Sequence, residues 1–306
     1  MRIVVTGGSG FLGSHIADAL SDAGHQVTIF DRAPSRWLRP DQIMMTGTVL
    51  DAGMVRAVLK DCDVVYHLAA VADIDEALDT PRQAVEVNVM GTLNLLEAAC
   101  ELGLKRFVFA SSIYVYSNQG SFYRTTKQAC ENLTHDYHER FGLNYTVLRF
   151  GSLYGPRADR SNGVHRMLTQ ALAERRMDYY GSGDEVREYI HVFDAAALSV
   201  DVLADEFVNQ YIHLTGRERM TSREMMTMVR EIMGGDIELK FGATSPPGHY
   251  VQTPYNYTPK LGRRLTRNTY IDLGLGLLDY LQQIDHVGGQ PGVKSQSEAK
   301  SEKTKS

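Results

Sequence analysis

The sequence predicts an α/β protein with a doubly wound parallel sheet and a smaller C-terminal lobe. Two observations support this prediction. Up to about Phe150, apolar runs of strand length alternate with segments of helical period, and a glycine-rich turn follows the first run. Buried strands that alternate with amphipathic helices form parallel sheets that are covered by helices on both faces.

The elements expected in residues 1–150 follow one another in a regular order. They are the strand RIVVT, a helix from about Phe11 to Ala23, the strands QVTIF and DVVYHLA, a long helix around Pro81 to Cys100, the strand RFVFAS, a helix from Tyr123 and a strand from Tyr145 to Phe150. This succession is typical of a Rossmann-type domain, which we assign to residues 1–150.

Beyond residue 150 the pattern loses its regularity. The segments RADRSNG, YYGSGDE and TSPPGHYVQTPYNYTPKLG are rich in glycine, proline and polar residues, as expected of long loops around short elements. We assign residues 151–286 mostly to a substrate-binding lobe, with some segments that return to the sheet. The tail of residues 287–306 has few large apolar residues and is predicted to be disordered.

The composition narrows the kinds of partner. The chain has 306 residues, a net charge of −5 and a pI near 6.1, without a dense cluster of lysine and arginine. We therefore expect a small-molecule partner, and neither nucleic acid nor a membrane. Three widely spaced cysteines, without the Cys/His pairs of a zinc site, favour a reducing cytoplasm and no metal. The opening run MRIVVTGG predicts a strand rather than a signal peptide.

The first strand leads into the run VVTGGSGFLGSH, where Gly7, Gly10 and Gly13 stand at a strand-to-helix turn. Small residues let the backbone approach a pyrophosphate, and the helix N-terminus offers free N–H groups. The alternative is a tight turn without a ligand. Asp31, which ends the next strand, would accept hydrogen bonds from ribose hydroxyls and repel a 2′-phosphate, which favours NAD. Arg32 beside it would instead favour NADP, because a guanidinium pairs with phosphate.

The stretch SSIYVYSNQGSFYRTTK holds a serine, a tyrosine and a lysine in an order that suggests a catalytic site. Tyr123 and Lys127 are four residues apart, so on a helix they share one face. A neighbouring ammonium and an oxidised nicotinamide would stabilise a phenolate, which makes Tyr123 a candidate base near neutral pH. Ser112, at the end of a strand, could hydrogen-bond the same substrate oxygen. A chance match is the alternative, but only Tyr123 among the 16 tyrosines has a lysine four residues later.

These motifs occur together with several others. The full set comprises TGGSGFLG, HLAA from His67, NVMGTLNLLEAA from Asn88, SSIYVY, YRTTK, RFGSLYGPR from Arg149 and REYIHVFD from Arg187. From Met1 to about Asp285 the chain resembles the extended short-chain dehydrogenases/reductases of the nucleotide-sugar epimerase and dehydratase family, which includes the UDP-glucose 4-epimerases.

The resemblance implies a role for each matching position. Tyr123 would be the base, Lys127 would hold the nicotinamide ribose and Ser112 would complete the catalytic set. Arg187 would bind the diphosphate of a sugar nucleotide, with Ser112 and Ser152 as further substrate contacts. The implied NAD contacts are Gly7, Gly10, Phe11, Leu12, Gly13, Asp31, Arg32, Val49, Leu68, Ala69, Ala70, Asn88, Ser111, Tyr123 and Lys127.

The two residues after Ser112 bear on the reaction. In the family's dehydratases and decarboxylases these positions carry carboxylates or related acids, whereas here they are Ile113 and Tyr114. The resemblance therefore favours a nucleotide-sugar 4-epimerase, which oxidises C4 of a UDP-hexose transiently and returns the hydride to the other face. A 4,6-dehydratase or decarboxylase, a 4-keto-sugar reductase and a non-catalytic dinucleotide sensor remain as alternatives.

Some positions depart from the family pattern. Gly47-Thr48 replaces the usual Gly-Asp pair near the adenine, and Ser152 replaces an asparagine that binds phosphate in many relatives. The run SPPGHY, from Ser245 to Tyr250, stands where relatives have Arg-Pro-Gly-Asp. If the nucleotide keeps its usual place, Arg157 or Arg217 is expected to replace the missing phosphate clamp.

The connector between the serine and the tyrosine is short. Tyr123 follows Ser112 by only eleven positions (123 minus 112), whereas most extended relatives have a longer loop that packs beside the substrate. We expect the chain to turn at Asn118-Gln119-Gly120 and to begin its helix with Ser121 as the N-cap. The missing loop is expected to leave the sugar side of the cleft wider, so that it admits a bulkier hexose.

Other prominent residues have ordinary structural explanations. His67 and His191 stand in apolar, strand-like runs, and we expect hydrogen-bonded core histidines rather than bases or ligands. For Arg187, the alternative to phosphate binding is an ion pair with Glu185 or Glu188.

The helices around Pro81 to Cys100 and Tyr123 to Phe141 resemble those that pair into a four-helix dimer interface in the family. The run VNVMGTLNLLEAA has apolar residues on more than one side, as a second buried surface would require. We therefore expect a homodimer, and burial of the helix within one monomer is the alternative.

Overall fold

The computed structural model describes residues 1–216, 219–243, 249 and 251. The predicted tail, Arg217 and the run Ser245 to Tyr250, apart from His249, lie outside the described residues. The described residues all belong to one compact unit. No helix in the described part of the chain combines the length and apolar content that a bilayer span requires.

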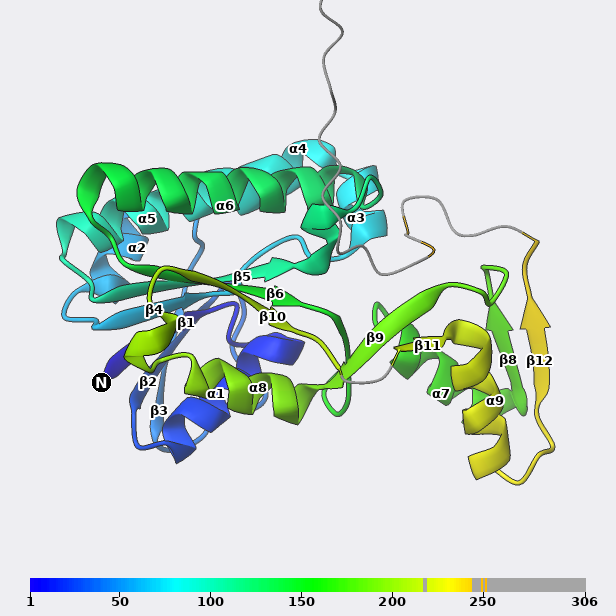
Figure 1. The fold of residues 1–306 in the computed structure, drawn as a ribbon. Coiled ribbons are helices and arrows are strands. Elements are labelled where there is room, and N and C mark those ends of the chain that lie inside the picture. Colours follow the sequence, from blue (N-terminus) through cyan, green and yellow to red (C-terminus); the bar gives the residue numbers. More distant parts are fainter. Residues whose placement is uncertain (217–218, 244–248, 250, 252–306) are drawn as a thin grey trace, which may run out of the picture. The chain divides into compact units, whose positions relative to one another are not determined.

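A seven-stranded parallel sheet forms the centre of the larger part of the molecule (Figure 1). Its strands lie in the order β3-β2-β1-β4-β5-β6-β10, and every pair is parallel. The strands are β1 (Arg2–Thr6), β2 (Gln26–Asp31), β3 (Gln42–Thr46), β4 (Val64–His67), β5 (Arg106–Ser112), β6 (Tyr145–Phe150) and β10 (Gln210–Leu214). The order reverses between β1 and β4, which is where such sheets bind dinucleotides.

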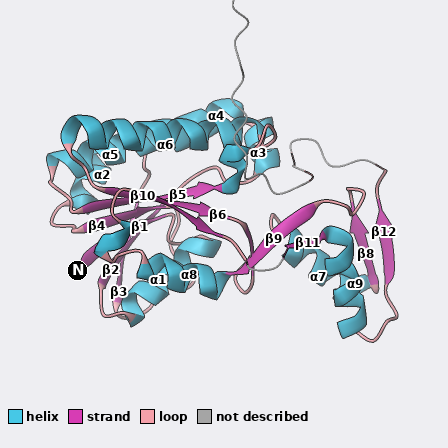
Figure 2. Ribbon diagram, viewed as in Figure 1, coloured by secondary structure: helices cyan, strands magenta, loops and turns pink. Residues whose placement is uncertain are grey.

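Helices cover both faces of this sheet (Figure 2). Helices α1 (Phe11–Asp22) and α8 (Val192–Asp201) pack on one face, with a core that includes Ile16, Leu20 and Ala195. The other face carries α2 (Ala52–Leu59), α5 (Gly91–Glu101) and α6 (Ser121–Phe141). This arrangement confirms the predicted doubly wound parallel sheet.

The helix expected around Pro81 to Cys100 consists of three consecutive segments. They are α4 (Pro81–Val85), a π-helical turn (Glu86–Met90) and α5. Asn88 lies in the π-helical turn and is buried, and its side chain bonds both backbone groups of Val71, at 2.7 Å to the N–H and 3.1 Å to the carbonyl. Such single π turns often mark functional sites, because they re-aim one side chain within a helix.

Three elements in this half were not predicted, namely β3, α2 and α3 (Ile74–Asp79). Strand β3 is at the edge of the sheet, and its Ile43 is 61% exposed, so it lacks the buried pattern of a central strand. Helix α3 has six residues, which is too short to show a helical period.

The short connector after β5 folds into a 3₁₀ helix, Ile113–Tyr116, followed by a turn. Gly120 enters the turn with φ of +101°, and a Cβ added there would lie 2.7 Å from Tyr114 Cδ1. Gly120 is therefore the N-cap of α6 and Ser121 is its first residue, so the prediction of Ser121 as the cap is wrong. The left-handed conformation required at the cap favours glycine.

The C-terminal lobe consists of short elements around a methionine-rich core. One small sheet has the order β11-β9-β7 and the other pairs β12 with β8. Met167, Met177 and Met226 are buried between these strands and two helices. The elements are β7 (Ser152–Tyr154), α7 (Gly163–Glu174), β8 (Arg176–Tyr179), β9 (Val186–His191), β11 (Arg219–Thr221), α9 (Ser222–Ile232) and β12 (Glu238–Phe241). The 3₁₀ turn Asp205–Phe207 instead packs on the large sheet, where Thr146 bonds the Phe207 carbonyl at 2.8 Å.

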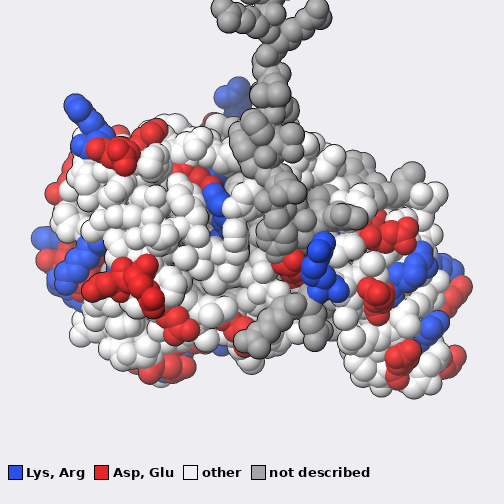
Figure 3. Space-filling view, viewed as in Figure 1, with Lys and Arg blue, Asp and Glu red and all other residues white. Residues whose placement is uncertain are grey.

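Acidic and basic side chains are interspersed on the described surface shown in Figure 3. Many of them form exposed pairs, such as Arg56 with Glu101 at 2.6 Å. Exposed pairs of this kind contribute little to stability, about 0–1 kcal/mol each.

Candidate active site

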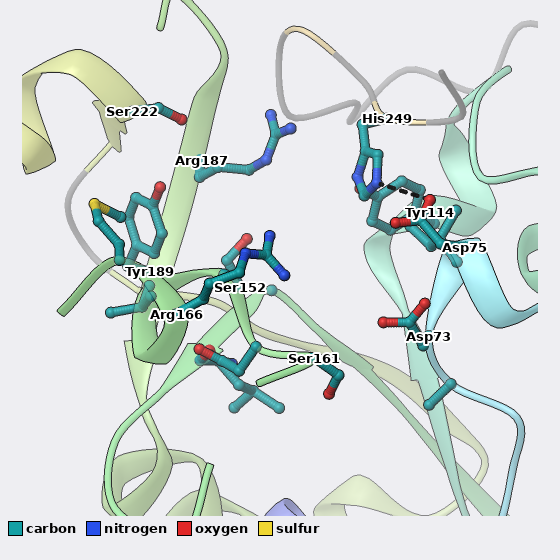
Figure 4. A pocket seen from close by; sticks show the side chains of 18 of the residues that line it. Asp73, Asp75, Tyr114, Ser152, Ser161, Arg166, Arg187, Tyr189, Ser222 and His249 are labelled. Carbon is teal, nitrogen blue, oxygen red and sulfur yellow. Dashed lines mark hydrogen bonds and ion pairs between the residues drawn. The ribbon is translucent and has the colours of Figure 1, made fainter. Parts of the chain in front are cut away.

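A cavity of about 520 Å³ opens beside the carboxyl end of β5, and residues from both the sheet and the lobe line it. Tyr123 and Ser112 face it from the sheet side, as the sequence predicted. Figure 4 shows two opposed walls, with Arg166, Arg187 and Ser152 on one and acidic and aromatic side chains on the other. The second wall contains Asp73, Asp75, Tyr114 and His249.

The structure brings the predicted serine, tyrosine and lysine together. Ser112 ends β5, and Tyr123 and Lys127 lie one helical turn apart near the start of α6. The Lys127 ammonium lies 5.8 Å from the centre of the Tyr123 ring and donates a 2.7 Å hydrogen bond to the Ala110 carbonyl. The carboxyl end of strand β5 and the first turns of helix α6 therefore hold all three groups.

The surroundings of Tyr123 and Lys127 shift their pKa values in opposite directions, and in each case toward the neutral form. Burial raises the pKa of Tyr123 to about 12, although a hydrogen bond with Ser112 opposes the shift. Burial also lowers the pKa of Lys127 to about 8, against the attraction of Cys130 and Glu131. In the protein alone Tyr123 is thus a neutral phenol and Lys127 is mostly an ammonium at pH 7, so the phenol needs further positive charge to act as a base.

A buried ion pair lies directly behind these residues. Glu131, one turn after Lys127, accepts hydrogen bonds from Arg149 at 2.6 and 3.0 Å. Ser111 donates to the same carboxylate at 2.6 Å. The guanidinium of Arg149 also stacks over the ring of Tyr116 at 4.7 Å. This network connects β5, β6 and α6 next to the catalytic side chains. It also occupies the hydroxyl of Ser111, which was predicted to contact the cofactor.

The glycine-rich turn has the geometry that a dinucleotide requires. Gly7 has φ of +71°, and a Cβ added there would lie 2.7 Å from the Ala69 nitrogen. A Cβ at Gly13 would lie 2.2 Å from the Gly7 carbonyl oxygen, so the helix packs closely on the strand. Gly10 caps α1 without a side-chain bond, which leaves the first N–H groups directed to the turn. Phe11 and Leu12 form the first residues of the same helix.

Asp31 stands at the end of β2, where an adenosine ribose would lie. Its carboxylate accepts the Ser9 N–H at 3.0 Å and the Ala33 N–H at 3.3 Å, which fixes it beside the glycine-rich turn. Arg32 is exposed next to it. A fixed carboxylate at this place fits ribose hydroxyls, so the residues present suit NAD.

The remaining predicted cofactor residues lie around the same edge of the sheet. Leu68, Ala69 and Ala70 follow β4 directly and are half-buried. Val49 is 6% exposed, and its side chain would be only 2.6 Å from a Cβ at Gly91. The Asn88 side chain hydrogen-bonds the Val71 backbone and the Thr126 hydroxyl. It therefore contributes to the pocket by fixing the position of the Val71 backbone.

The two histidines assigned ordinary roles have hydrogen-bond partners. His67 is buried between the hydroxyls of Thr6 at 2.8 Å and Thr92 at 2.9 Å, and burial lowers its pKa to about 3. The prediction of a core histidine is confirmed at this position. His191 is half-buried and accepts the Phe193 N–H at 3.2 Å as the N-cap of α8, so it begins a helix rather than filling the core.

Two arginines face the cavity from the lobe. Arg187 is a buried residue of β9, whereas Arg166 is an exposed residue of α7, and both guanidinium groups extend into the cavity in Figure 4. Ser152, the first residue of β7, lies beside Arg166. The predicted positions Arg187 and Ser152 are thus brought together at one wall.

The expectation that Arg157 serves as a second phosphate clamp is wrong. Its guanidinium pairs with Asp18 on α1 at 2.7 Å and stacks over Trp37 at 4.9 Å, so it does not line the cavity. The chain turns toward α1 after β7 because Gly155 adopts a φ of +137°. Among the described residues, Arg166 and Arg187 are the arginines that line the cavity.

Sequence reasoning did not identify Arg166, Asp73, Asp75 or His249. Arg166 shows no motif, and its place follows only from the direction of α7. Asp73 and Asp75 flank the start of α3, where the Asp73 carboxylate accepts the Glu76 N–H at 2.9 Å. An aspartate three residues before a glutamate is a cap signal that could have located this helix.

The space beside the short connector is partly filled. The Tyr114 hydroxyl and His249 Nδ1 are 3.0 Å apart, and both side chains line the cavity. A residue from a distant segment thus occupies the side of the pocket that was expected to be open. The expectation that the sugar side of the cleft is wider is therefore wrong.

A model of the NAD dependent epimerase/dehydratase family matches residues 3–212. The match spans the glycine-rich turn, the serine-tyrosine-lysine set and Arg187. The chain belongs to this family. It is therefore an enzyme of that class, and its cofactor is NAD.

Relatives in the family differ in their reactions. A dTDP-glucose 4,6-dehydratase of Streptomyces antibioticus is 29% identical over 261 residues, which cover 76% of this chain and 78% of the relative. A UDP-glucuronic acid decarboxylase of Arabidopsis thaliana is 27% identical and covers 86% of this chain and 67% of the relative. The structure of a UDP-glucuronic acid 4-epimerase from Bacillus cereus, in complex with UDP-glucuronic acid and NAD, has a TM-score of 0.77 and 26% identity, and the match covers 93% of this chain and all of that one (100%).

Proposed function

We propose that the protein is an NAD-dependent nucleotide-sugar 4-epimerase, with a UDP-hexose as the favoured substrate. The observation that carries the proposal is the meeting of Ser112, Tyr123 and Lys127 at a cavity whose opposite wall holds two arginines. Ile113 and Tyr114 follow the serine, so the carboxylates used for elimination in the family's dehydratases are absent from those two positions. The likeness to the Bacillus cereus 4-epimerase structure supports the same reaction.

Tyr123 has the role of the base in this proposal. The phenol first releases its proton to solvent, and the phenolate then takes the proton from the sugar O4 while Ser112 hydrogen-bonds the same oxygen. NAD supplies the hydride acceptor at C4 and the positive charge that brings the pKa of Tyr123 down. Lys127 adds its own charge from the next helical turn. The proton and the hydride both return to the sugar, so the cycle has no net redox change.

Arg187 and Arg166 are proposed to bind the diphosphate. Arginine binds phosphate oxygens through two parallel N–H groups, and the two guanidinium groups extend from the same wall. Ser152 lies within the same wall and can donate a hydroxyl. Strong binding of the diphosphate would let the sugar stay loosely held, which the C4 ketone needs in order to present its other face.

The test uses the purified protein without added cofactor. UDP-glucose, UDP-galactose and their uronic-acid and N-acetyl forms are incubated separately, and the stereochemistry at C4 is followed by NMR together with NADH absorbance. Interconversion of one pair without net NADH is the expected result. Tyr123→Phe should abolish it, and Tyr137→Phe on the same helix is the matched control. Stoichiometric NADH formation or consumption would support a dehydrogenase or a keto-sugar reductase instead.

We also propose a homodimer that forms through α4, the π-helical turn and α6. Val85, Met90 and Phe122 on these segments are 44%, 46% and 41% exposed, and Val85 and Phe122 line one shallow hollow. Exposed apolar side chains that gather in this way mark association surfaces. Light scattering should give twice the mass of the chain, and Met90→Glu should shift it to the monomer mass.

A cytoplasmic location, which three free cysteines favour, stays a prediction.

A further inference from the structure

Two carboxylates stand on the wall of the cavity that also carries the reacting groups. Asp73 and Asp75 line the cavity, and Figure 4 shows them across from Arg166 and Arg187. Both belong to the start of α3, which packs against α6. Tyr123 of α6 packs against the small apolar cluster to which α3 contributes. The two acidic side chains therefore lie near the end of the cavity where C4 of the sugar would react.

The fold holds the Asp73 carboxylate in place. Asp73 is the N-cap of α3, and its side chain accepts the Glu76 N–H at 2.9 Å. One such bond uses only part of the capacity of a carboxylate, which accepts about four hydrogen bonds. Asp73 is half-buried, whereas the Asp75 side chain is 77% exposed. Because water screens exposed charges, Asp73 should act on a ligand more strongly than Asp75.

The charge of this wall is not neutralised within the described part of the chain. No lysine or arginine described there comes within 4.0 Å of either carboxylate, and His249 Nε2 lies 4.0 Å from Asp75. Burial lowers the pKa of His249 and Arg187 lowers it further, although Asp75 opposes the shift. The imidazole is therefore mostly neutral at pH 7, and the wall keeps its negative charge.

The two walls thus carry opposite charges across one cavity of about 520 Å³. The arginine wall suits a diphosphate, and the acidic wall suits a cation. A second carboxylate placed beside Asp73 would be repelled, since like charges at short range disfavour binding. A ligand that matches both walls carries phosphate at one end and a positive group at the other.

We propose that Asp73, assisted by Asp75, selects a nucleotide sugar that carries a free amino group on the hexose and discriminates against uronic acids. The inference rests on the proposed function and names the class of its substrate, a UDP-amino-hexose. The ammonium would donate charge-assisted hydrogen bonds to the Asp73 carboxylate. Neither aspartate takes part in the hydride transfer, so the selection acts through binding.

The experiment measures binding directly, so that it does not depend on turnover. Isothermal titration calorimetry on the NAD-loaded protein compares UDP-glucose, UDP-glucuronic acid, UDP-glucosamine and its 3-amino isomer. The pH is about 6.5, where an amine with the usual pKa of an α-amino group is charged. We expect at least one amino sugar to bind about tenfold more tightly than UDP-glucose, and the uronic acid to bind at least about tenfold less tightly.

Asp73→Asn removes the charge and keeps a residue that caps helices, so α3 should be preserved. It should bring the Kd values of the amino sugar and UDP-glucose to within about threefold of each other. Asp75→Asn should change the ratio less, because its side chain is exposed. Asp79→Asn, at the end of the same helix and outside the cavity, is the matched control and should leave the ranking unchanged.

Inversion at C4 is followed by NMR on the same preparations, so this inference and the proposed function are judged separately. Amino sugars that bind no more tightly than UDP-glucose to the wild type overturn the inference, even where C4 inversion proceeds. A ranking that is unchanged in Asp73→Asn also overturns it. The expected ranking without inversion at C4 would support the charge selection and contradict the proposed reaction. Circular dichroism confirms that the variants are folded.

Discussion

The two sides of the cavity are built differently. On the sheet side, Ser112 and Lys127 are 7% and 4% exposed and project from a seven-residue strand and a 21-residue helix. On the lobe side, Ser152 belongs to a three-residue strand and Arg166 is exposed on α7, and Arg187 is the buried member of this wall. Buried side chains on long elements are difficult to move, whereas exposed ones on short elements change with little effect on the fold. We therefore expect the sheet side to determine the chemistry and the lobe side to determine the substrate.

This division accounts for relatives with one fold and several reactions. Dehydratases, decarboxylases and epimerases all resemble this chain at 26–29% identity over most of its length. A shared site for hydride transfer needs the rigid side, and each further reaction needs only a few side chains around the sugar.

The strongest test of the sheet side is Tyr123→Phe. Loss of the phenol removes the base, and we expect kcat to fall by about 10³–10⁴, near the upper range for acid–base catalysis. NAD content should change little, because the substitution removes a single hydroxyl and leaves the glycine-rich turn and Asp31 intact. A kcat within tenfold of the wild type would show that another group takes the O4 proton.

Lys127→Met should reduce kcat by about 10²-fold, because the phenolate of Tyr123 loses its nearest ammonium. The same substitution removes a charge that burial disfavours, so thermal stability should be equal or higher. Differential scanning calorimetry together with steady-state kinetics separates the two effects. A large fall in stability would mean that the lysine is structural.

Glu131→Gln should destabilise the sheet side by about 3 kcal/mol, because it leaves the charge of Arg149 buried without a partner. Both side chains are largely buried, at 8% and 14% exposure. Urea unfolding measures the change. Glu139→Gln, which is exposed on the same helix, should have almost no effect.

Substitutions on the lobe side of the cavity should mainly change KM. Arg187→Ala should raise KM by about 10–100-fold, since a buried hydrogen bond to a charged group contributes about 1.5–3 kcal/mol. Arg166→Ala should raise it only about threefold, because exposed pairs contribute less. Arg176→Ala, in the same lobe but outside the cavity, serves as the control. Equal effects at all three positions would contradict the placement of the diphosphate.

The pH profile gives a smaller but specific effect. Burial lowers the pKa of Lys127 to about 8, so its ammonium is present below pH 8 and is lost as the pH rises through that value. Wild-type kcat should therefore fall above about pH 8, and this alkaline fall should be absent from the residual activity of Lys127→Met. A variant that retains the same fall would assign it to another group.

The sequence predicted the sheet side well because its signals are local. Strand β6 has the expected bounds, and the spacing of Tyr123 and Lys127 by itself places them on one helix face. Helix α3 was missed because its six residues are too few to show a helical period. Arg166 and the contact of His249 with Tyr114 were missed for a different reason. They depend on how segments far apart in the chain meet, 135 positions apart for Tyr114 and His249, and no local pattern records such a meeting.

The fate of the hydrogen at C4 tests the central claim most directly. UDP-glucose that carries deuterium at C4 is converted by the protein with its own NAD, and the product is analysed by NMR and mass spectrometry. Transient oxidation at C4 predicts that the deuterium stays on C4 of UDP-galactose. Loss of the label to water, or its transfer to free NADH, would contradict a hydride that leaves and returns within one site.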